Sequence, residues 1–185
     1  MSEHAAALES ALEVLGLGGQ VIPIRRPEHL QQVHAAVLPG GESTTIAKLL
    51  VKFGLQEQLL ARAQQGMPLL GTCAGAILLA SQGDTEVQRT ATELLALMDI
   101  AVDRNAYGRQ RDSFEATLSV EGWDRPLHGV FIRAPAITRT WGRVKVLARH
   151  AGAAVLVQQG HLLAATFHPE LAGDSRLHQL LVSLL

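Results

Sequence analysis

The chain has 185 residues, of which 48% are hydrophobic, and a formal net charge of −1 at pH 7. This length suits one domain with a substantial core and is short for two, so residues 1–185 are predicted to form a single domain. The near-neutral charge and the lack of a basic run argue against nucleic acid or an anionic membrane as the main partner. The one cysteine excludes an internal disulfide and a multi-cysteine metal site, and it suits a reducing cytoplasm. We find no stretch that would span a bilayer and no signal peptide.

The first half of the sequence alternates between apolar helices and short apolar strands. A helix is predicted from Ser2 to Gly16, and its apolar stripe consists of Ala5, Leu8, Leu12 and Leu15. Strands are predicted at residues 20–24, 35–38 and 67–70, and helices at residues 46–53, 56–65 and 76–80. Strands and helices that alternate through short glycine turns predict an α/β fold. In this fold a doubly wound, mostly parallel sheet is covered by helices on both faces.

The second half is richer in strand patterns. Residues 82–93 are polar and predicted to form a surface loop. Strands are predicted at residues 100–102, 114–120, 130–133, 144–147, 154–157 and 162–167. A closing helix begins after a cap at Asp174 or Ser175. No linker separates the two halves, so both are assigned to the same domain.

Cys73 stands between a predicted strand and a predicted helix, with Gly71 and Gly75 on either side. The pattern G-x-C-x-G is the thiol version of the nucleophile elbow, in which a larger residue at either glycine position would collide with the nucleophile. A helix N-terminus favours the thiolate, and the backbone N–H of Ala74 is available to an oxyanion. The alternative is a core cysteine, because free cysteine is among the most buried residue types.

The last predicted strand ends in Phe167-His168-Pro169-Glu170. Open α/β sheets place their active sites beyond strand ends, and Pro169 stiffens the turn so that His168 and Glu170 can project the same way. A base oriented by a carboxylate is what a nucleophilic cysteine requires. The alternative is a histidine hydrogen-bonded to solvent. That interpretation is preferred for the other seven histidines: His4, His29, His34, His128, His150, His161 and His178.

Three loops have the composition of binding segments. In Pro39-Gly40-Gly41-Glu42-Ser43-Thr44-Thr45, two glycines allow a substrate close to the backbone and the helix start presents N–H donors. An ordinary turn with an N-cap is the alternative. Arg104 lies in a basic segment of residues 103–110, and Arg133 follows an apolar strand and precedes a proline. Arginines in such places bind carboxylates, although a lone surface arginine is usually solvated.

Together, G-T-C-A-G and F-H-P-E resemble the class I glutamine amidotransferases, whose domain carries a Cys–His–Glu triad. The segments P-G-G-E-S-T-T, R-N-A-Y-G-R-Q, D-S-F-E and G-V-F-I-R-A-P narrow the resemblance to the glutaminase subunit of pyridoxal 5′-phosphate synthase. It extends from His4 to the C-terminal helix. The resemblance implies a catalytic triad of Cys73, His168 and Glu170. It also implies that glutamine is held by Gly41, Glu42, Ser43, Arg104, Ile132 and Arg133.

The implied reaction hydrolyses L-glutamine through a thioester on Cys73, with an oxyanion stabilised by backbone N–H groups at Gly40 and Ala74. No metal and no organic cofactor is implied. In the family, the ammonia passes to a separate barrel-shaped synthase subunit, which builds the cofactor from a pentose phosphate and a triose phosphate. Family members begin with an apolar strand and a Leu-Gln-Gly turn, whereas here Met1-Ser2 leads directly into Glu3-His4. The first strand of the sheet is therefore expected to be missing.

Two alternatives of other classes remain at this point. One is a stress-response or chaperone-like member of the wider cysteine-elbow superfamily, in which an acidic residue near the thiol favours oxidation. The other is a non-catalytic subunit that only binds the synthase. Release of glutamate from glutamine distinguishes both from the glutaminase.

Overall fold

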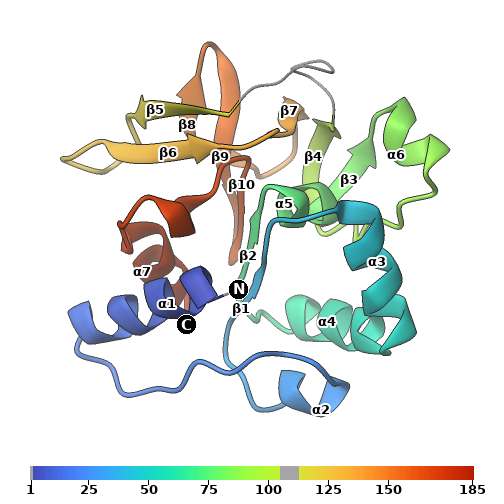
Figure 1. Cartoon of the computed structure of the whole chain (residues 1–185), viewed down its shortest axis with the longest axis horizontal. Helices are drawn as coiled ribbons and strands as arrows, with labels where there is room; N and C mark the ends of the chain where they lie inside the picture. The colour runs from blue at the N-terminus through green and yellow to red at the C-terminus, as the bar shows by residue number, and fades with distance from the viewer. Residues whose placement is uncertain (1, 105–112) are drawn as a thin grey trace.

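The structure, a computed structural model, describes residues 2–104 and 113–185. In this part of the chain an eight-stranded sheet has the order β1-β2-β10-β9-β7-β4-β3, with β8 beside β9 (Figure 1). Its strands are β1 (Ala36–Leu38), β2 (Leu69–Thr72), β3 (Ala80–Gly83), β4 (Met98–Asp103), β7 (Ala136–Thr140), β8 (Lys145–His150), β9 (Ala153–Gln159) and β10 (Leu162–Ala165). A smaller sheet pairs β5 (Phe114–Leu118) with β6 (Leu127–Phe131).

The sheet is parallel at one end and mixed elsewhere. Strands β1, β2 and β10 run parallel to one another, as do β3 and β4. The pairs β10–β9, β8–β9, β7–β9 and β4–β7 are antiparallel. Only residues 151–152 separate β8 from β9, and only residues 160–161 separate β9 from β10, and connections this short join antiparallel strands. The α/β fold is confirmed, while its sheet holds more antiparallel pairs than the expected mostly parallel arrangement.

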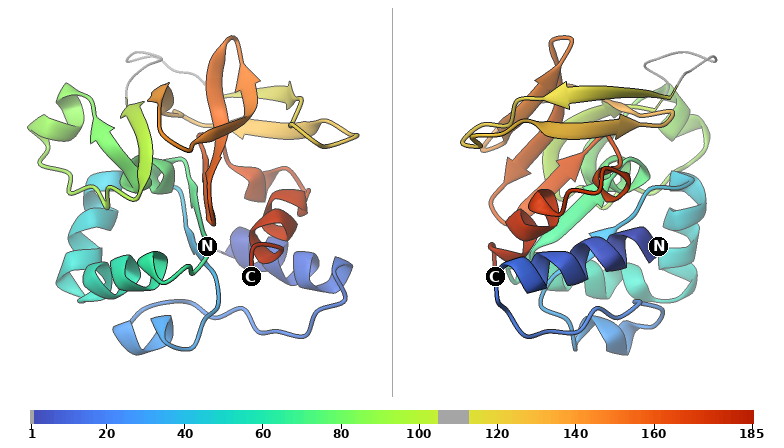
Figure 2. Two further views of the ribbon diagram at one scale, coloured as in Figure 1. Left: turned by 180° about the vertical axis from the view of Figure 1, so that it is seen from behind. Right: turned by 60° about the vertical axis from the view of Figure 1, so that its left-hand side comes forward.

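Two apolar cores lie on the two faces of the sheet, as the alternation along β2 shows. Leu69 belongs to the core under α3 (Ser43–Lys52), α4 (Leu55–Gln64) and α5 (Ala74–Leu79), together with α2 (Pro27–Leu30) and α6 (Thr85–Arg89). Leu70 belongs to the core on the other face, which is covered by α1 (Ser2–Val14), α7 (Arg176–Val182) and the β5–β6 sheet. Figures 1 and 2 show α1 and α7 on the side opposite to α3 and α4. Helices on both faces are therefore as predicted.

Several local predictions differ from the structure. Residues 17–25 form no strand, because β1 is the edge strand of the sheet on that side and pairs only with β2. The predicted surface loop at residues 82–93 contains the end of β3 and the helix α6, whose N-cap Asp84 accepts a hydrogen bond from the Val87 N–H at 2.8 Å. Strand β7 was not predicted. In α1 the predicted stripe is partly wrong, since Leu15 is 39% exposed while His4 and Ala11 are buried.

No helix within the described ranges combines the length and the apolar character that crossing a membrane requires.

Candidate active site

Three loops meet at the ends of β1, β2 and β10, because parallel neighbours place their carboxyl ends at the same edge of a sheet. Gly40 follows β1, Cys73 follows β2 and His168 follows β10. A Cβ atom at Gly40 would lie 2.5 Å from His168 Cε1 and 3.4 Å from Cys73 Cβ. Three residues that the sequence analysis assigned to one site, from positions 40, 73 and 168, are therefore in contact.

Cys73 occupies a strained turn at the start of α5. Its φ is 49° and its ψ is −106°, values that residues with a side chain rarely adopt, and the residue is 7% exposed. Its N–H donates to the Ala165 carbonyl of β10 at 2.8 Å, which ties the elbow to the neighbouring strand. Among the described residues no backbone carbonyl accepts from the Ala74 N–H, so this donor remains available beside the thiol.

Gly71 and Gly75 are required for a reason other than the one predicted. A Cβ atom at Gly71 would lie 2.6 Å from the Gly75 backbone, and one at Gly75 would lie 2.0 Å from the Leu38 carbonyl oxygen. The collisions are thus with the start of α5 and with β1 rather than with the nucleophile. Because both contacts are with backbone atoms, neither glycine can be replaced without moving a strand or a helix.

His168 and Glu170 form the predicted pair. Glu170 lies in η1 (Pro169–Leu171), and His168 directly precedes this short helix. The Nδ1–H of His168 donates to Glu170 Oε1 at 2.8 Å, and the two side chains are 13% and 9% exposed. The hydrogen bond to Cys73 is the largest cause that raises the pKa of His168, and the hydrogen bond to Glu170 is the second. Together they outweigh burial and bring this pKa to about 10. The imidazole is therefore cationic at neutral pH and faces the sulfur. The backbone N–H of His168 donates to the Val130 carbonyl at 2.8 Å, so β6 also holds this residue in place.

Behind Glu170 lie two histidines that the sequence analysis assigned to solvent. His4 is 5% exposed and His178 is fully buried, so that interpretation is wrong for both. His4 Nε2 lies 3.3 Å from Glu170 Oε2 and 3.1 Å from Thr72 Oγ1, and His4 Nδ1 lies 3.0 Å from His178 Nε2. A signal was available in the sequence: His4, with Leu8 and Ala11, follows the helical spacing of a buried stripe.

Burial and charge act on this group together. Burial raises the pKa of Glu170, but the hydrogen bond from His168 and the positive charge of that imidazole bring it below its usual value, and a proton on His4 would lower it further. Burial lowers the pKa of His4, and burial together with the nearby His4 lowers the pKa of His178 to about 4. The site therefore contains one ionised carboxylate between a cationic imidazole on the thiol side and neutral imidazoles on the other side.

The loop after β1 supplies the predicted binding residues Gly41, Glu42 and Ser43. Gly41 has a φ of 143°, a value suited to glycine. The Glu42 carboxylate caps α3, accepting from the N–H groups of Thr44 at 3.2 Å and Thr45 at 2.7 Å. Burial raises the pKa of Glu42, but these hydrogen bonds and the charge of Arg104 outweigh it and lower the pKa to about 2. Ser43 is 2% exposed, and its hydroxyl has no partner among the described residues.

Arg104 reaches this loop from the end of β4. Its Nη2 donates to Glu42 Oε1 at 2.8 Å, and its Nη1 donates to the hydroxyl oxygens of Thr44 at 3.2 Å and Thr90 at 3.1 Å. The structure thus brings Arg104 together with the Glu42 loop, as an ion pair rather than as a free cation. Residues 105–110 of the predicted basic segment lie outside the described residues.

The remaining predicted binding residues, Ile132 and Arg133, directly follow β6. Ile132 is 37% exposed, and Arg133 is exposed with a φ of 45°. Because the carbonyl of Val130 accepts from the His168 N–H, this exposed and strained turn begins beside the predicted base. Strain at a non-glycine residue of this kind is often found where a ligand is held.

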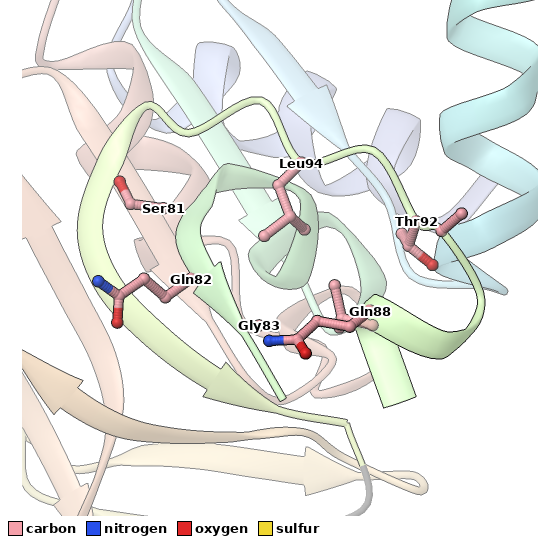
Figure 3. A pocket seen from close by; sticks show the side chains of 8 residues that line it. Ser81, Gln82, Gly83, Gln88, Thr92 and Leu94 are labelled. Atoms are coloured by element: carbon pink, nitrogen blue, oxygen red, sulfur yellow. The ribbon is translucent and has the colours of Figure 1, made fainter. Parts of the chain in front are cut away.

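A separate pocket of about 390 Å³ lies beside β3 and α6 (Figure 3). It is lined by side chains and backbone of Ser81, Gln82, Gly83, Val87, Gln88, Ala91, Thr92 and Leu94, and by none of the three triad candidates. Within residues 2–104 and 113–185, no three His, Cys, Asp or Glu side chains are grouped so as to hold a metal ion.

Comparison with known proteins agrees with the geometry. The SNO glutamine amidotransferase family matches residues 1–185. The chain belongs to this family. It is 49% identical over 179 residues to the pyridoxal 5′-phosphate synthase subunit PdxT of Methanosarcina mazei, covering 97% of this chain and 90% of that protein. It is 50% identical over 184 residues to the protein of the same name from Streptomyces coelicolor, covering 99% of this chain and 87% of that protein.

A crystal structure of a glutamine amidotransferase superposes on this member of the family with a TM-score of 0.86. The two chains are 44% identical, and the match covers 99% of this chain and 92% of the other. The resemblance drawn from the sequence motifs is therefore confirmed. Membership of the amidotransferase family also favours that prediction over the chaperone-like alternative.

Proposed function

We propose that the chain is the glutaminase subunit of a pyridoxal 5′-phosphate synthase, which hydrolyses L-glutamine to glutamate and ammonia. The observation that carries this proposal is the convergence of Cys73, His168 and Glu170 at the ends of parallel strands in a chain of the glutamine amidotransferase family. The relatives from Methanosarcina mazei and Streptomyces coelicolor are named as subunits of that synthase.

In the proposed reaction the Cys73 thiolate attacks the side-chain carboxamide carbon of glutamine. The backbone N–H groups at Ala74 and at Gly40 hold the oxyanion of the tetrahedral intermediate, and both residues adjoin the thiol. His168, cationic at neutral pH, gives its proton to the departing ammonia and leaves a thioester. The neutral imidazole then takes a proton from water, which attacks the thioester and releases glutamate. Glu170 orients His168 throughout, and no metal or organic cofactor is needed.

Glutamine is held, in this proposal, by Gly41, Glu42, Ser43, Arg104, Ile132 and Arg133. The buried Ser43 hydroxyl lacks a partner among the described residues, as expected of a group that waits for a ligand. Arg104 fixes the Glu42 carboxylate, so it acts on the substrate through that side chain. The turn at Ile132 and Arg133, strained at Arg133, follows β6, whose Val130 carbonyl accepts from the His168 N–H.

We further propose that the partner is a barrel-shaped synthase subunit that receives the ammonia, with no nucleic acid or membrane partner. The net charge of −1 supports the second part. We also propose a cytoplasmic location, which suits a reactive thiol in a chain with one cysteine. We treat residues 1–185 as one glutamine amidotransferase domain, since both cores pack against the same sheet.

The test is glutamate release from glutamine, measured with and without the synthase subunit and compared with Cys73→Ala. The glutaminase proposal predicts release that depends on Cys73. Binding to the synthase with no release under either condition would instead identify a non-catalytic subunit. Loss of the thiol to peroxide without glutamate release would favour the redox alternative.

A further inference from the structure

We propose that His4 is a positioning residue for the glutaminase reaction, which holds the outer oxygen of Glu170 so that the carboxylate keeps His168 aligned with Cys73. The proposal rests on the proposed function. It concerns a buried series of neighbouring side chains from four elements: Glu170 in η1, His4 in α1, Thr72 in β2 and His178 in α7. Figure 1 shows α1 lying against α7, and this packing goes with the 3.0 Å contact between His4 Nδ1 and His178 Nε2.

The need for such a residue follows from the two oxygens of Glu170. Oε1 accepts from His168 Nδ1 at 2.8 Å. Oε2 is buried and accepts no hydrogen bond from the described residues, while His4 Nε2 lies 3.3 Å from it. A buried carboxylate oxygen is costly unless an N–H or a positive charge faces it. His4 supplies that group from the side opposite to His168.

The direction of the N–H groups can be deduced from His178, the last side chain of this hydrogen-bonded series. His178 Nδ1 is buried without a partner among the described residues. A buried N–H without an acceptor is rarer than an acceptor without a donor, so the proton of neutral His178 belongs on Nε2. His178 Nε2–H then donates to His4 Nδ1 over 3.0 Å, and the proton of neutral His4 belongs on Nε2. That N–H donates to Thr72 Oγ1 at 3.1 Å, and the same nitrogen lies 3.3 Å from Glu170 Oε2.

His178 therefore fixes the tautomer of His4, and His4 presents its N–H to the triad. The opposite tautomers would leave an unpaired N–H on His178 and would turn a lone pair of His4 towards the Glu170 carboxylate. Both outcomes are unfavourable in a buried site. A histidine that merely filled the core would not need its Nε2–H in this place, and this difference makes the proposal testable.

The experiment uses two substitutions that retain a side-chain amide but place it differently. In His4→Gln the amide nitrogen falls near the Nε2 position and still faces Glu170. In His4→Asn the amide falls near the Nδ1 position, where it reaches His178 only. Glutamate release is measured with the full chain and saturating synthase subunit. We expect kcat to fall roughly 10- to 100-fold in His4→Asn and by less than about threefold in His4→Gln, with the KM for glutamine unchanged in both.

The matched control is His161→Gln, since His161 also makes a side-chain hydrogen bond, from Nε2 to the Ala63 carbonyl at 2.8 Å, but at the opposite end of β10. It should keep the kcat of the wild type. Glu170→Gln provides a second arm: if His4 acts through Glu170, adding His4→Asn to Glu170→Gln should lower kcat no further. This arm compares folded variants with each other, and circular dichroism establishes that each one is folded.

A third readout does not depend on glutamine turnover. Because the chain has one cysteine, its alkylation by iodoacetamide reports on the Cys73 thiolate alone. We expect His4→Asn to slow alkylation several-fold and His4→Gln to leave it near the wild-type rate. Equal kcat and alkylation in all variants would overturn the proposal, as would equal losses in His4→Gln and His4→Asn or an additive loss in the Glu170→Gln background. If the wild type releases no glutamate, the proposed function fails and the alkylation rates alone decide the role of His4.

Discussion

Gly40 lies so close to His168 that a Cβ atom at position 40 would come within 2.5 Å of the imidazole Cε1. The glycine therefore sets the distance between the loop after β1 and the proposed base, His168. Since His168 is held by Glu170 on one side and by the Val130 carbonyl through its N–H, it has little freedom to retreat. A side chain at position 40 must displace either the base or the loop.

Gly40→Ala should consequently lower kcat for glutamate release by roughly 100-fold, because a displacement of about 1 Å at a catalytic group is enough for such a loss. Gly18→Ala is the matched control, since nothing lies within 4 Å of a Cβ at that position and it is far along the chain from the triad. A Gly40→Ala variant as active as Gly18→Ala would show that the loop shifts without affecting the base.

Cys73→Ala should abolish glutamate release while leaving the fold and synthase binding intact, because the change is small and the role is chemical. With ammonium salt supplied, the synthase subunit should still form product. The pKa of His168 should also fall in this variant, since the hydrogen bond to Cys73 is the first cause of its rise to about 10. Titration of the imidazole by NMR measures that shift. Retention of a tenth of the wild-type glutamate release would refute the nucleophile assignment.

His168→Asn should be nearly as damaging as loss of Cys73, and Glu170→Gln less so. The base moves protons in both halves of the reaction, whereas the carboxylate orients it and stabilises its charge. Steady-state rates of glutamate release measured side by side check this order. Mild and equal losses from the two substitutions would make His168 a structural residue at the end of β10.

Glu42→Ala should raise the KM for glutamine with little change in kcat, and so should Arg104→Ala, because the two side chains form one ion pair in the binding loop. Their effects on KM should be far from additive in the double variant. Glu42→Ala should in addition lower the free energy of unfolding by about 1 kcal/mol, because the carboxylate is the N-cap of α3. A large fall in kcat at constant KM would place either residue in the transition state instead.

His178 makes the stability of the protein depend on pH on the acidic side of neutrality. Burial, with His4 beside it, lowers the folded-state pKa to about 4, whereas the unfolded value is 6.5. Between these two pH values the unfolded chain therefore binds more protons than the folded chain. As a result, the contribution of His178 to the free energy of unfolding is fully present above about pH 6.5 and is lost as pH falls towards 4. The nearby carboxylates of Glu170 and Asp174 oppose this effect and are included in the shift.

The shift corresponds to a loss on the order of 3 kcal/mol in the free energy of unfolding across that interval. Urea unfolding between pH 7.5 and 4.5 measures it, and His178→Gln should flatten the dependence. The exposed His128 supplies the control substitution, His128→Gln, which should leave the slope as it is. A slope that survives in His178→Gln would assign the titration to other groups.

The positions of the three loops proposed to form the active site could be predicted, because each is encoded by a short local pattern. Gly40, Cys73 and His168 each follow an apolar strand, and the three strands that precede them are parallel neighbours. Local chemistry and the general placement of active sites in α/β sheets therefore suffice to bring them together. The roles of glycines 71 and 75 were less accessible, since their collisions are with the backbones of α5 and β1, which only the packed structure reveals.

The remaining differences arise from pairing and burial between distant segments. Residues 20–24 have a strand's composition but no neighbouring strand, while β7 has a weaker pattern and pairs with both β4 and β9. His4 and His178 are separated by 174 positions, and although the helical spacing places His4 on a buried stripe, neither segment indicates the other. Their burial depends on α1 packing against α7, an event that the pattern within either helix does not specify.

The paired leucines of β2 have a consequence for how the chain folds. Leu69 and Leu70 face opposite cores, so a slip of this strand by one position would move one leucine into the other's place and put Pro68 or Gly71 in the second core position. Gly71 prevents the slip, because a neighbouring residue moved into its place would drive a Cβ to 2.6 Å from the Gly75 backbone. The register of β2 and the position of the thiol in its turn thus both depend on the absence of a side chain at position 71. In a slipped register Cys73 would also leave its turn, so the contact between positions 40, 73 and 168 would be lost together with the packing of β2.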